Sequence, residues 1–272
     1  MSAGARPLRL PIGPAGVAAA VIGAALVAWI VTIERMRGMD AGPGTDLGAL
    51  GWYVGVWVTM MAAMMLPSAA PMVLVFARMA RSRARDAGAG ASAHAATIAF
   101  VAGYLVVWTA FGLVAYAVFR GLRALDLGLL RWDAQGPLVA GAAVAAAGLY
   151  ELTPLKRVCL RHCRSPFHFV AHAWRPGATG ALRLGVVHGG YCVGCCLGLM
   201  VILFALGVMS VLWMAVVAAV IFVQKVLPLG AATRGGLAVV LVGLGIWIAA
   251  APGSVPGLRQ PDAAAGMSMM SR

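Results

Sequence analysis

Residues 188–223 read HGGYCVGCCLGLMVILFALGVMSVLWMAVVAAVIFV. From position 197 onward the stretch is almost unbroken in apolar residues, and a helix of about 20 such residues is long enough to cross a bilayer. Just before this run lie Cys192, Cys195 and Cys196, with His188 four residues ahead of the first cysteine. On a helix, positions 188, 192 and 195 share one face. The stretch therefore predicts a membrane helix that carries soft-metal or thiol redox donors at one end.

The composition of the whole chain indicates a membrane protein. Hydrophobic residues make up 62% of the 272 positions and charged residues only 11%, whereas a soluble domain is about 25% charged. We predict an all-α, polytopic transmembrane helix bundle. Seven apolar segments are candidates for spans: 14–33, 52–77, 97–119, 136–153, 184–206, 209–227 and 235–251. One long helix across 197–223 would reduce the number to six.

The same distribution predicts a single transmembrane domain over residues 1–255, followed by a tail at 256–272. The first apolar segment is too long for a signal peptide and lacks a small-residue cleavage site, so we interpret it as a retained helix. The tail contains Met267, Met269 and Met270. These thioethers could form a soft-ligand cluster, but we favour a disordered terminus.

The net charge of +13 is distributed in a way that sets an orientation. With seven spans and a cytosolic N-terminus, about two thirds of the 21 Lys and Arg residues lie on the cytosolic side, as the positive-inside rule requires. The C-terminus is then outside, whereas six spans would leave it inside. Anionic lipid headgroups account for the basic loops, so we expect membrane lipids as partners and no nucleic acid.

A second cysteine pair lies between the fourth and fifth predicted spans. Cys159 and Cys163 are four residues apart, and Arg157, Arg161 and Arg164 fall on nearly the opposite helix face. This pattern predicts a cytosolic interfacial helix with arginines toward headgroups and thiols toward the protein. Both cysteine groups then lie at one depth in a reducing compartment, where structural disulfides are rare. The alternative is that these cysteines are small, inert apolar residues.

The second predicted span carries a stripe of methionines. Met61, Met64 and Met65 follow helical spacing, and Pro67 and Pro71 come directly after them. Thioethers are neutral ligands for Cu(I), and prolines in membrane helices free backbone carbonyls near cavities. Methionine also fills irregular gaps in apolar packing, so the stripe fits either a metal path or packing.

Missing motifs exclude several classes of protein. The sequence contains no phosphate-binding loop of the Gly-x-x-x-x-Gly-Lys-Ser/Thr type and no His-Glu-x-x-His or Gly-x-Ser-x-Gly motif. The chain therefore lacks the signatures of a P-loop ATP-driven pump, a zinc protease and a serine hydrolase.

Four motifs together resemble a known family. They are Met61-x-x-Met64-Met65-x-Pro67, Gly103-Tyr104-x-x-x-Trp108, Thr153-Pro154-Leu155-Lys156-x-x-Cys159-x-x-x-Cys163, and His188-Gly189-x-Tyr191-Cys192-x-Gly194-Cys195-Cys196. In these motifs the chain resembles the bacterial predicted metal-binding integral membrane proteins of unassigned function, sometimes labelled copper chaperones, over about residues 52–230. Leu197 departs from the aromatic residue usual after the cysteine pair. The resemblance implies a metal-binding membrane protein, with copper as the metal most often proposed. We also predict that the protein is not an enzyme and lies in the bacterial inner membrane.

The leading hypothesis is therefore a membrane protein that binds Cu(I), with zinc as the competing metal. The expected ligands are Cys192 and Cys195, with Cys196, His188, Cys159 or Cys163 completing the shell. Met61, Met64 and Met65 would be secondary contacts along a transfer path to a copper-donor or cuproenzyme partner. Two other hypotheses stay open: a transmembrane thiol–disulfide carrier, and a structural membrane subunit or permease. The oligomeric state is not predicted.

Overall fold

The computed structural model describes residues 13–37, 47–86, 92–125, 135–208, 210–227 and 230–255, and these residues are helical with no strand among them. The predicted methionine tail and the C-terminus lie outside this range. The helices are α1 (Pro14–Met36), α2 (Leu50–Asp86), α3 (Ser92–Ala124), α4 (Gly136–Tyr150), α5 (Pro154–Arg164), α6 (Pro166–Ala173), α7 (Gly177–Leu206), α8 (Val211–Val226) and α9 (Ala231–Ala250), with a short 3-10 turn at Pro252–Ser254.

All seven predicted apolar segments coincide with helices. Five helices are long and apolar enough to cross a membrane, namely α1, α2, α3, α7 and α9. A sixth is added if α4 and α5, which meet at a bend of 64°, count as one span. The helix α8 is apolar but has only 16 residues. The helical class is thus confirmed, while the number of spans stays a prediction.

The chain breaks between α7 and α8, so the apolar run after position 197 is not one long helix. Gly207 has a φ angle of +110°, in a region that residues with a side chain rarely adopt. The backbone N–H of Ser210 donates to the carbonyl of Gly207 at 3.1 Å, which closes the turn. The chain then returns as α8 against α2 and α7.

Two helix pairs approach each other closely through glycine. In the pair α3–α7, a Cβ on Gly103 would collide with the carbonyl of Leu182, and one on Gly185 with the carbonyl of Phe100. In the pair α4–α9, a Cβ on Gly141 would collide with the carbonyl of Gly245. Small residues at such contacts are typical of helices that associate within a membrane.

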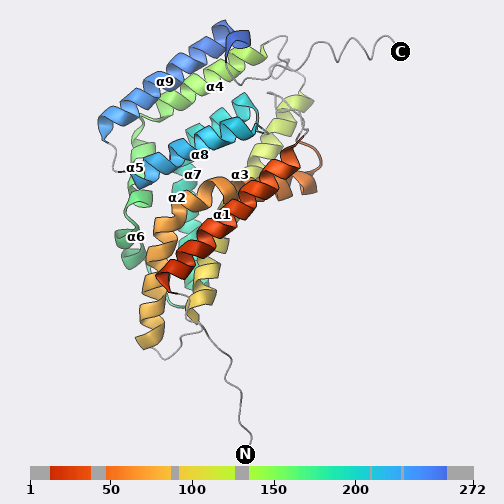
Figure 1. Cartoon of the computed structure of the whole chain (residues 1–272). Helices are drawn as coiled ribbons and strands as arrows, with labels where there is room; N and C mark the ends of the chain where they lie inside the picture. Colours follow the sequence, from red (N-terminus) through yellow and green to blue (C-terminus); the bar gives the residue numbers. More distant parts are fainter. Residues whose placement is uncertain are drawn as a thin grey trace, which may run out of the picture.

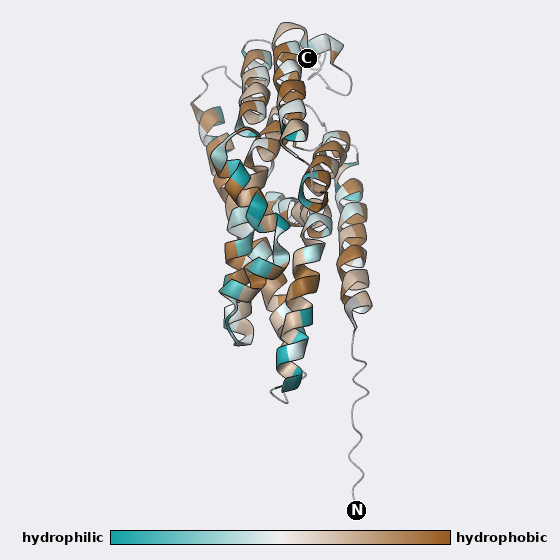
Figure 2. Ribbon diagram, turned by 90° about the vertical axis from the view of Figure 1, so that its left-hand side faces the viewer, coloured by the Kyte–Doolittle hydropathy of each residue, from teal (hydrophilic) through white to brown (hydrophobic). Residues whose placement is uncertain are grey.

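The pair α4–α9 lies above the rest of the bundle in Figure 1, and α5 and α6 descend along one side. The hydrophilic positions gather on the side formed by α5 and α6 and toward the C-terminal end of α2 (Figure 2). Between these elements, α2, α3, α7 and α8 enclose the main core, which contains Trp57, Trp108 and four of the five cysteines. The separate helix predicted between the fourth and fifth segments is present as α5, and its place at a membrane interface stays a prediction.

Candidate metal centre

The cysteine-rich part of α7 faces the core. The helix is continuous from Gly177 to Leu206, so His188, Cys192 and Cys195 share one face as expected. All three are buried, and Cys196 is buried as well. The structure therefore brings Cys196 to the same interior, although its register sets it off the His188 face.

Cys192, Cys195 and Cys196 form the tightest donor group, which we call the thiol trio. Their Sγ atoms all lie within 4.8 Å of one another. The Sγ atoms of Cys195 and Cys196 are 3.5 Å apart, and the Cys195 thiol donates to the carbonyl of Cys192 at 3.2 Å. Among the residues the structure describes, this is the one group of three or more His, Cys, Asp or Glu side chains spaced to hold a metal ion.

The helix α5 brings the second cysteine pair to the trio, as the sequence predicts. The Sγ of Cys163 is 3.8 Å from the Sγ of Cys195. Cys159 is buried against α7 at Gly194, where a Cβ would come within 2.7 Å of its sulfur. Gly194 is thus the residue that lets α5 approach. The two cysteine groups, far apart in sequence, meet in one place.

A buried polar network holds α5 in this position. The Glu151 carboxylate accepts hydrogen bonds from Lys156 Nζ and, at 2.9 Å, from Gln224 Nε2. Glu151 and Lys156 are both fully buried, and a buried charge is tolerated only when it is paired. Thr153 caps the start of α5 by accepting from the backbone N–H of Lys156. This network fixes the bend between α4 and α5 and ties it to α8.

Lys225 is the main feature of the centre that sequence reasoning missed. Its Nζ lies 2.9 Å from the Sγ of Cys192 and 3.3 Å from the Oγ of Ser68. The hydroxyl of Tyr104 is 3.0 Å from the same sulfur. A signal was present in the sequence, because a lysine inside an apolar segment is a functional candidate by default.

His188 lies in an aromatic pocket rather than in the thiol trio. Its ring stacks on Tyr104 and Phe100 at centroid distances of 5.4 and 6.0 Å, and Phe169 lies at 5.7 Å. The buried Nδ1 atom has no hydrogen-bond partner in the structure. His188 is therefore near Cys192 along the helix but is not brought into the donor group.

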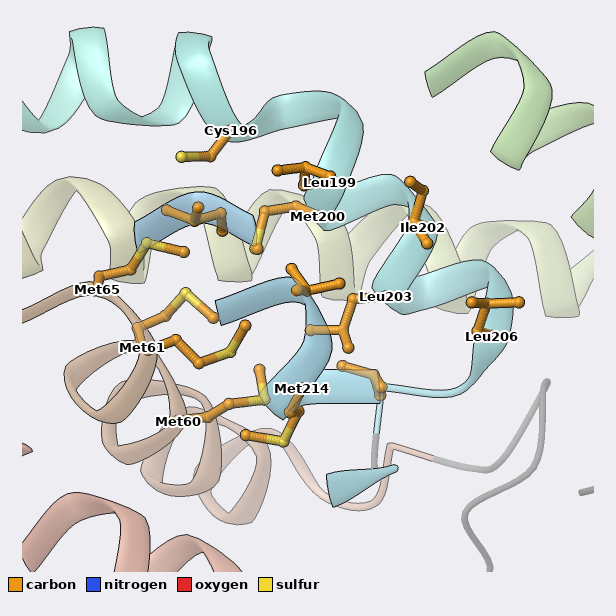
Figure 3. Packing of buried hydrophobic residues seen from close by; sticks show 14 of the residues in the cluster. Met60, Met61, Met65, Cys196, Leu199, Met200, Ile202, Leu203, Leu206 and Met214 are labelled. Atoms are coloured by element: carbon orange, nitrogen blue, oxygen red, sulfur yellow. The ribbon is translucent and has the colours of Figure 1, made fainter. Parts of the chain in front are cut away.

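The predicted methionines line the core beside the trio. Met61, Met64 and Met65 are at most 1% exposed and belong to the same core as the thiols. Figure 3 shows Met61 and Met65 reaching from α2 toward α7 and α8, where Met200 and Met214 lie. The last two, and Met60 beside them, were not among the predicted site residues.

The donor set fits a soft metal better than a hard one. Thiolates and thioethers select Cu(I) or zinc, whereas Ca²⁺ and Mg²⁺ need several oxygen ligands. The buried carboxylate of Glu151 is already bound to Lys156 and Gln224. The residues brought together can hold a monovalent or divalent soft cation away from water.

Comparison with known proteins supports a metal-handling role. A family model described as "PpoB2: Copper chaperone" matches residues 54–248. No curated protein and no solved structure matches the chain. The matched region covers the thiol trio, α5, the methionines of α2 and Lys225.

Proposed function

The chain belongs to the PpoB2 copper chaperone family, and we propose from this premise that it is an integral membrane protein that binds Cu(I) and passes it on. Family membership confirms the resemblance noted in the sequence and suggests a non-enzymatic role. The observation that carries the proposal is the thiol trio, whose three buried Sγ atoms lie within 4.8 Å of one another.

In this proposal the trio binds the copper ion and Cys163 assists from α5. Its sulfur lies 3.8 Å from that of Cys195 and belongs to a different helix. Cys159 supports α5 from its place against Gly194. His188, whose Nδ1 is unpartnered, is a reserve ligand one turn from Cys192.

Lys225 supplies the compensating charge. Three thiolates and one Cu(I) carry a net charge of −2, which is costly to bury without a counter-charge. The ammonium of Lys225, 2.9 Å from Cys192 Sγ, offsets one unit of it. Zinc, with one more positive charge, would need less compensation and is the competing metal.

The methionines of α2 are proposed as a path for the ion. Met61, Met64 and Met65 are neutral, so they can contact Cu(I) in an apolar interior without a counter-ion. They lie in the same core as the trio. We place the protein in the bacterial inner membrane with a cytosolic N-terminus, and we propose a copper-donor or cuproenzyme protein as its partner.

The first test is copper binding by purified protein under reducing conditions. Cu(I) affinity is measured by competition with a chromogenic chelator for the wild type, for Cys192→Ser/Cys195→Ser and for Cys159→Ser/Cys163→Ser. We expect one tightly bound copper in the wild type, loss of that copper in the first variant and partial retention in the second. The two variants lose equal numbers of thiols, so they separate the trio from the pair on α5.

The same experiment tests zinc and the redox alternative. A wild type that holds zinc but not Cu(I) would contradict the choice of metal. The short distance between the sulfurs of Cys163 and Cys195 also suits a reversible disulfide between α5 and α7. The number of free thiols is counted under oxidising and reducing conditions. A lower number under oxidising conditions, with no bound metal in either state, would favour that carrier over the chaperone.

A further inference from the structure

On the outer side of α5, away from the thiol trio, the surface is hollowed and basic. The hollow has a volume of about 480 Å³, and four of its seven lining residues are arginines. Arg157, Arg161 and Arg164 come from α5, and Arg234 comes from the first turn of α9. None of the described residues that line it is an acid. Four guanidinium groups around one hollow repel each other unless an anion lies between them.

Glu151, which precedes α5 in the chain, cannot serve as that anion. It is fully buried, and its two oxygens accept from Lys156 and Gln224. Arg164 is held in place because its Nε donates to the carbonyl of Gln224 at 2.6 Å. The described lining of the hollow thus carries four arginines, a charge that suits an anionic ligand.

An apolar groove continues from the basic hollow. It has a volume of about 250 Å³ and runs between α8 and α9, where Ala219, Val223 and Leu237 line it. Arg164 and Arg234 line both the groove and the hollow. A single ligand that fills both therefore has an anionic end and an apolar end, joined at these two arginines.

We propose that the hollow and the groove together bind one anionic phospholipid. The phosphate of the headgroup lies among the arginines of α5 and α9, and an acyl chain lies in the groove between α8 and α9. Guanidinium groups bind phosphate oxygens through paired hydrogen bonds, and basic pockets between membrane helices on the cytoplasmic side bind acidic lipids. The site faces away from the thiol trio, so the proposal does not depend on copper.

The test uses delipidated full-length protein in detergent and phosphatidylglycerol as the probe, with phosphatidylcholine as the neutral comparison. Lipid retention is measured by native mass spectrometry across a titration. We expect one phosphatidylglycerol to bind per chain, in preference to phosphatidylcholine. In Arg157→Gln/Arg161→Gln/Arg234→Gln the affinity for phosphatidylglycerol should fall about a hundredfold. Each arginine near an anionic lipid contributes a similar amount to the binding free energy, and three are lost. Arg164 is left intact because it bonds to Gln224.

A matched control carries the same change of charge elsewhere. Arg78→Gln/Arg85→Gln/Arg120→Gln removes three exposed arginines that line neither hollow nor groove, and it should change the affinity by less than about threefold because distant exposed charges are screened. If both triple variants lost affinity for phosphatidylglycerol equally, the lipid would be bound by general charge attraction. That result would contradict a specific lipid site.

The acyl part of the proposal has its own variant. Ala219 is exposed and lines the groove, so Ala219→Trp should block the chain while leaving every arginine in place. We expect it to lose phosphatidylglycerol, whereas Val114→Trp on the exposed face of α3 should retain it. If inorganic phosphate displaces the lipid at millimolar concentration and Ala219→Trp binds normally, the hollow is a free-anion site and the lipid is the wrong ligand.

Discussion

At the scale of single residues, the sulfur of Cys192 is contacted by polar groups from several helices. Its sulfur contacts the Lys225 ammonium, the Tyr104 hydroxyl and, within 4.8 Å, the other two sulfurs of the trio. These partners come from α8, α3 and α7. Groups on two other helices, α8 and α3, thus meet at this one sulfur of α7.

Removing the charge of Lys225 should therefore weaken the metal centre. Lys225→Leu keeps an apolar stem but loses the ammonium, and unlike methionine it adds no thioether that could bind copper. We expect Cu(I) affinity to fall by about thirtyfold or more, because truncating one member of a buried charge pair costs about 2–5 kcal/mol. Tyr104→Phe removes one hydrogen bond at the same sulfur, from an uncharged hydroxyl. Because no buried counter-charge is lost, it should cost less, about tenfold or below. The chelator competition described above measures both.

The order of the two effects is the informative result. If Tyr104→Phe weakened copper binding more than Lys225→Leu, charge compensation would not be the role of Lys225. Each variant also needs an unfolding midpoint in the absence of copper, so that a loss of the fold is not mistaken for a loss of affinity.

At the scale of elements, the close approach of α3 and α7 sets the geometry around the trio. Gly185 and Gly103 allow the two backbones to touch, and that contact places Tyr104 of α3 beside Cys192 of α7. The helix α5 reaches the trio through a separate gap at Gly194. Two glycine contacts, on different sides of α7, thus bring the partners of the cysteines within reach.

Gly185→Ala should separate α3 from α7 and destabilise the protein. Its Cβ would collide with the carbonyl of Phe100, a backbone atom that cannot move aside without shifting the helix. We expect a loss of about 1–3 kcal/mol, the usual cost of overpacking, seen as a lower midpoint of thermal unfolding in detergent.

Gly190→Ala is the matched control for this substitution. It lies on the same helix, and a Cβ there meets nothing within 4 Å. Alanine is the better helix former by about 1 kcal/mol, so this variant should be as stable as the wild type or slightly more so. Equal destabilisation in both variants would mean that the contact between α3 and α7 is not what limits stability.

At the scale of the whole molecule, the orientation predicted from the charges can be tested directly. In a variant with all five cysteines replaced by serine, a single cysteine is placed at Ser165, between α5 and α6, or at Gly121, near the end of α3. Both positions are exposed. A membrane-impermeant thiol reagent should label position 165 only from the cytosolic side and position 121 only from the opposite side. Labelling of both from one side would refute the predicted topology.

Helices could be predicted over much of the chain, but their ends and their contacts could not. Each of the seven predicted segments is a long run of apolar residues. Such a run is the strongest sequence signal of a membrane helix. The helix α2 nevertheless extends to Asp86, past the predicted end at 77, because charged residues continue a helix beyond its apolar part. The sequence is compatible with either two helices or one long helix across 197–223. The left-handed φ angle of Gly207 decides for two helices.

The candidate site was predicted in part for a similar reason. The face shared by Cys192 and Cys195 and the pairing of Cys159 with Cys163 follow from spacing within one helix. The contact of Lys225 with Cys192 depends on how α8 is rotated against α7 and α2, which no local pattern specifies. The placement of His188 among aromatic rings instead of beside the thiols likewise depends on α3 and α6, whose residues Phe100, Tyr104 and Phe169 surround it.

The division of the cysteines between α7 and α5 has a consequence for how copper would leave. All three sulfurs of the trio belong to α7, whereas Cys163 belongs to α5. The helix α5 begins at the bend of 64° that follows α4. In the proposed function, a thiol of a partner protein would take the place of Cys163, because Cys163 is on a different helix from the trio. Copper would then move by associative exchange, in which the incoming sulfur binds before the outgoing ones release, and the direction of transfer would be set by relative affinity alone.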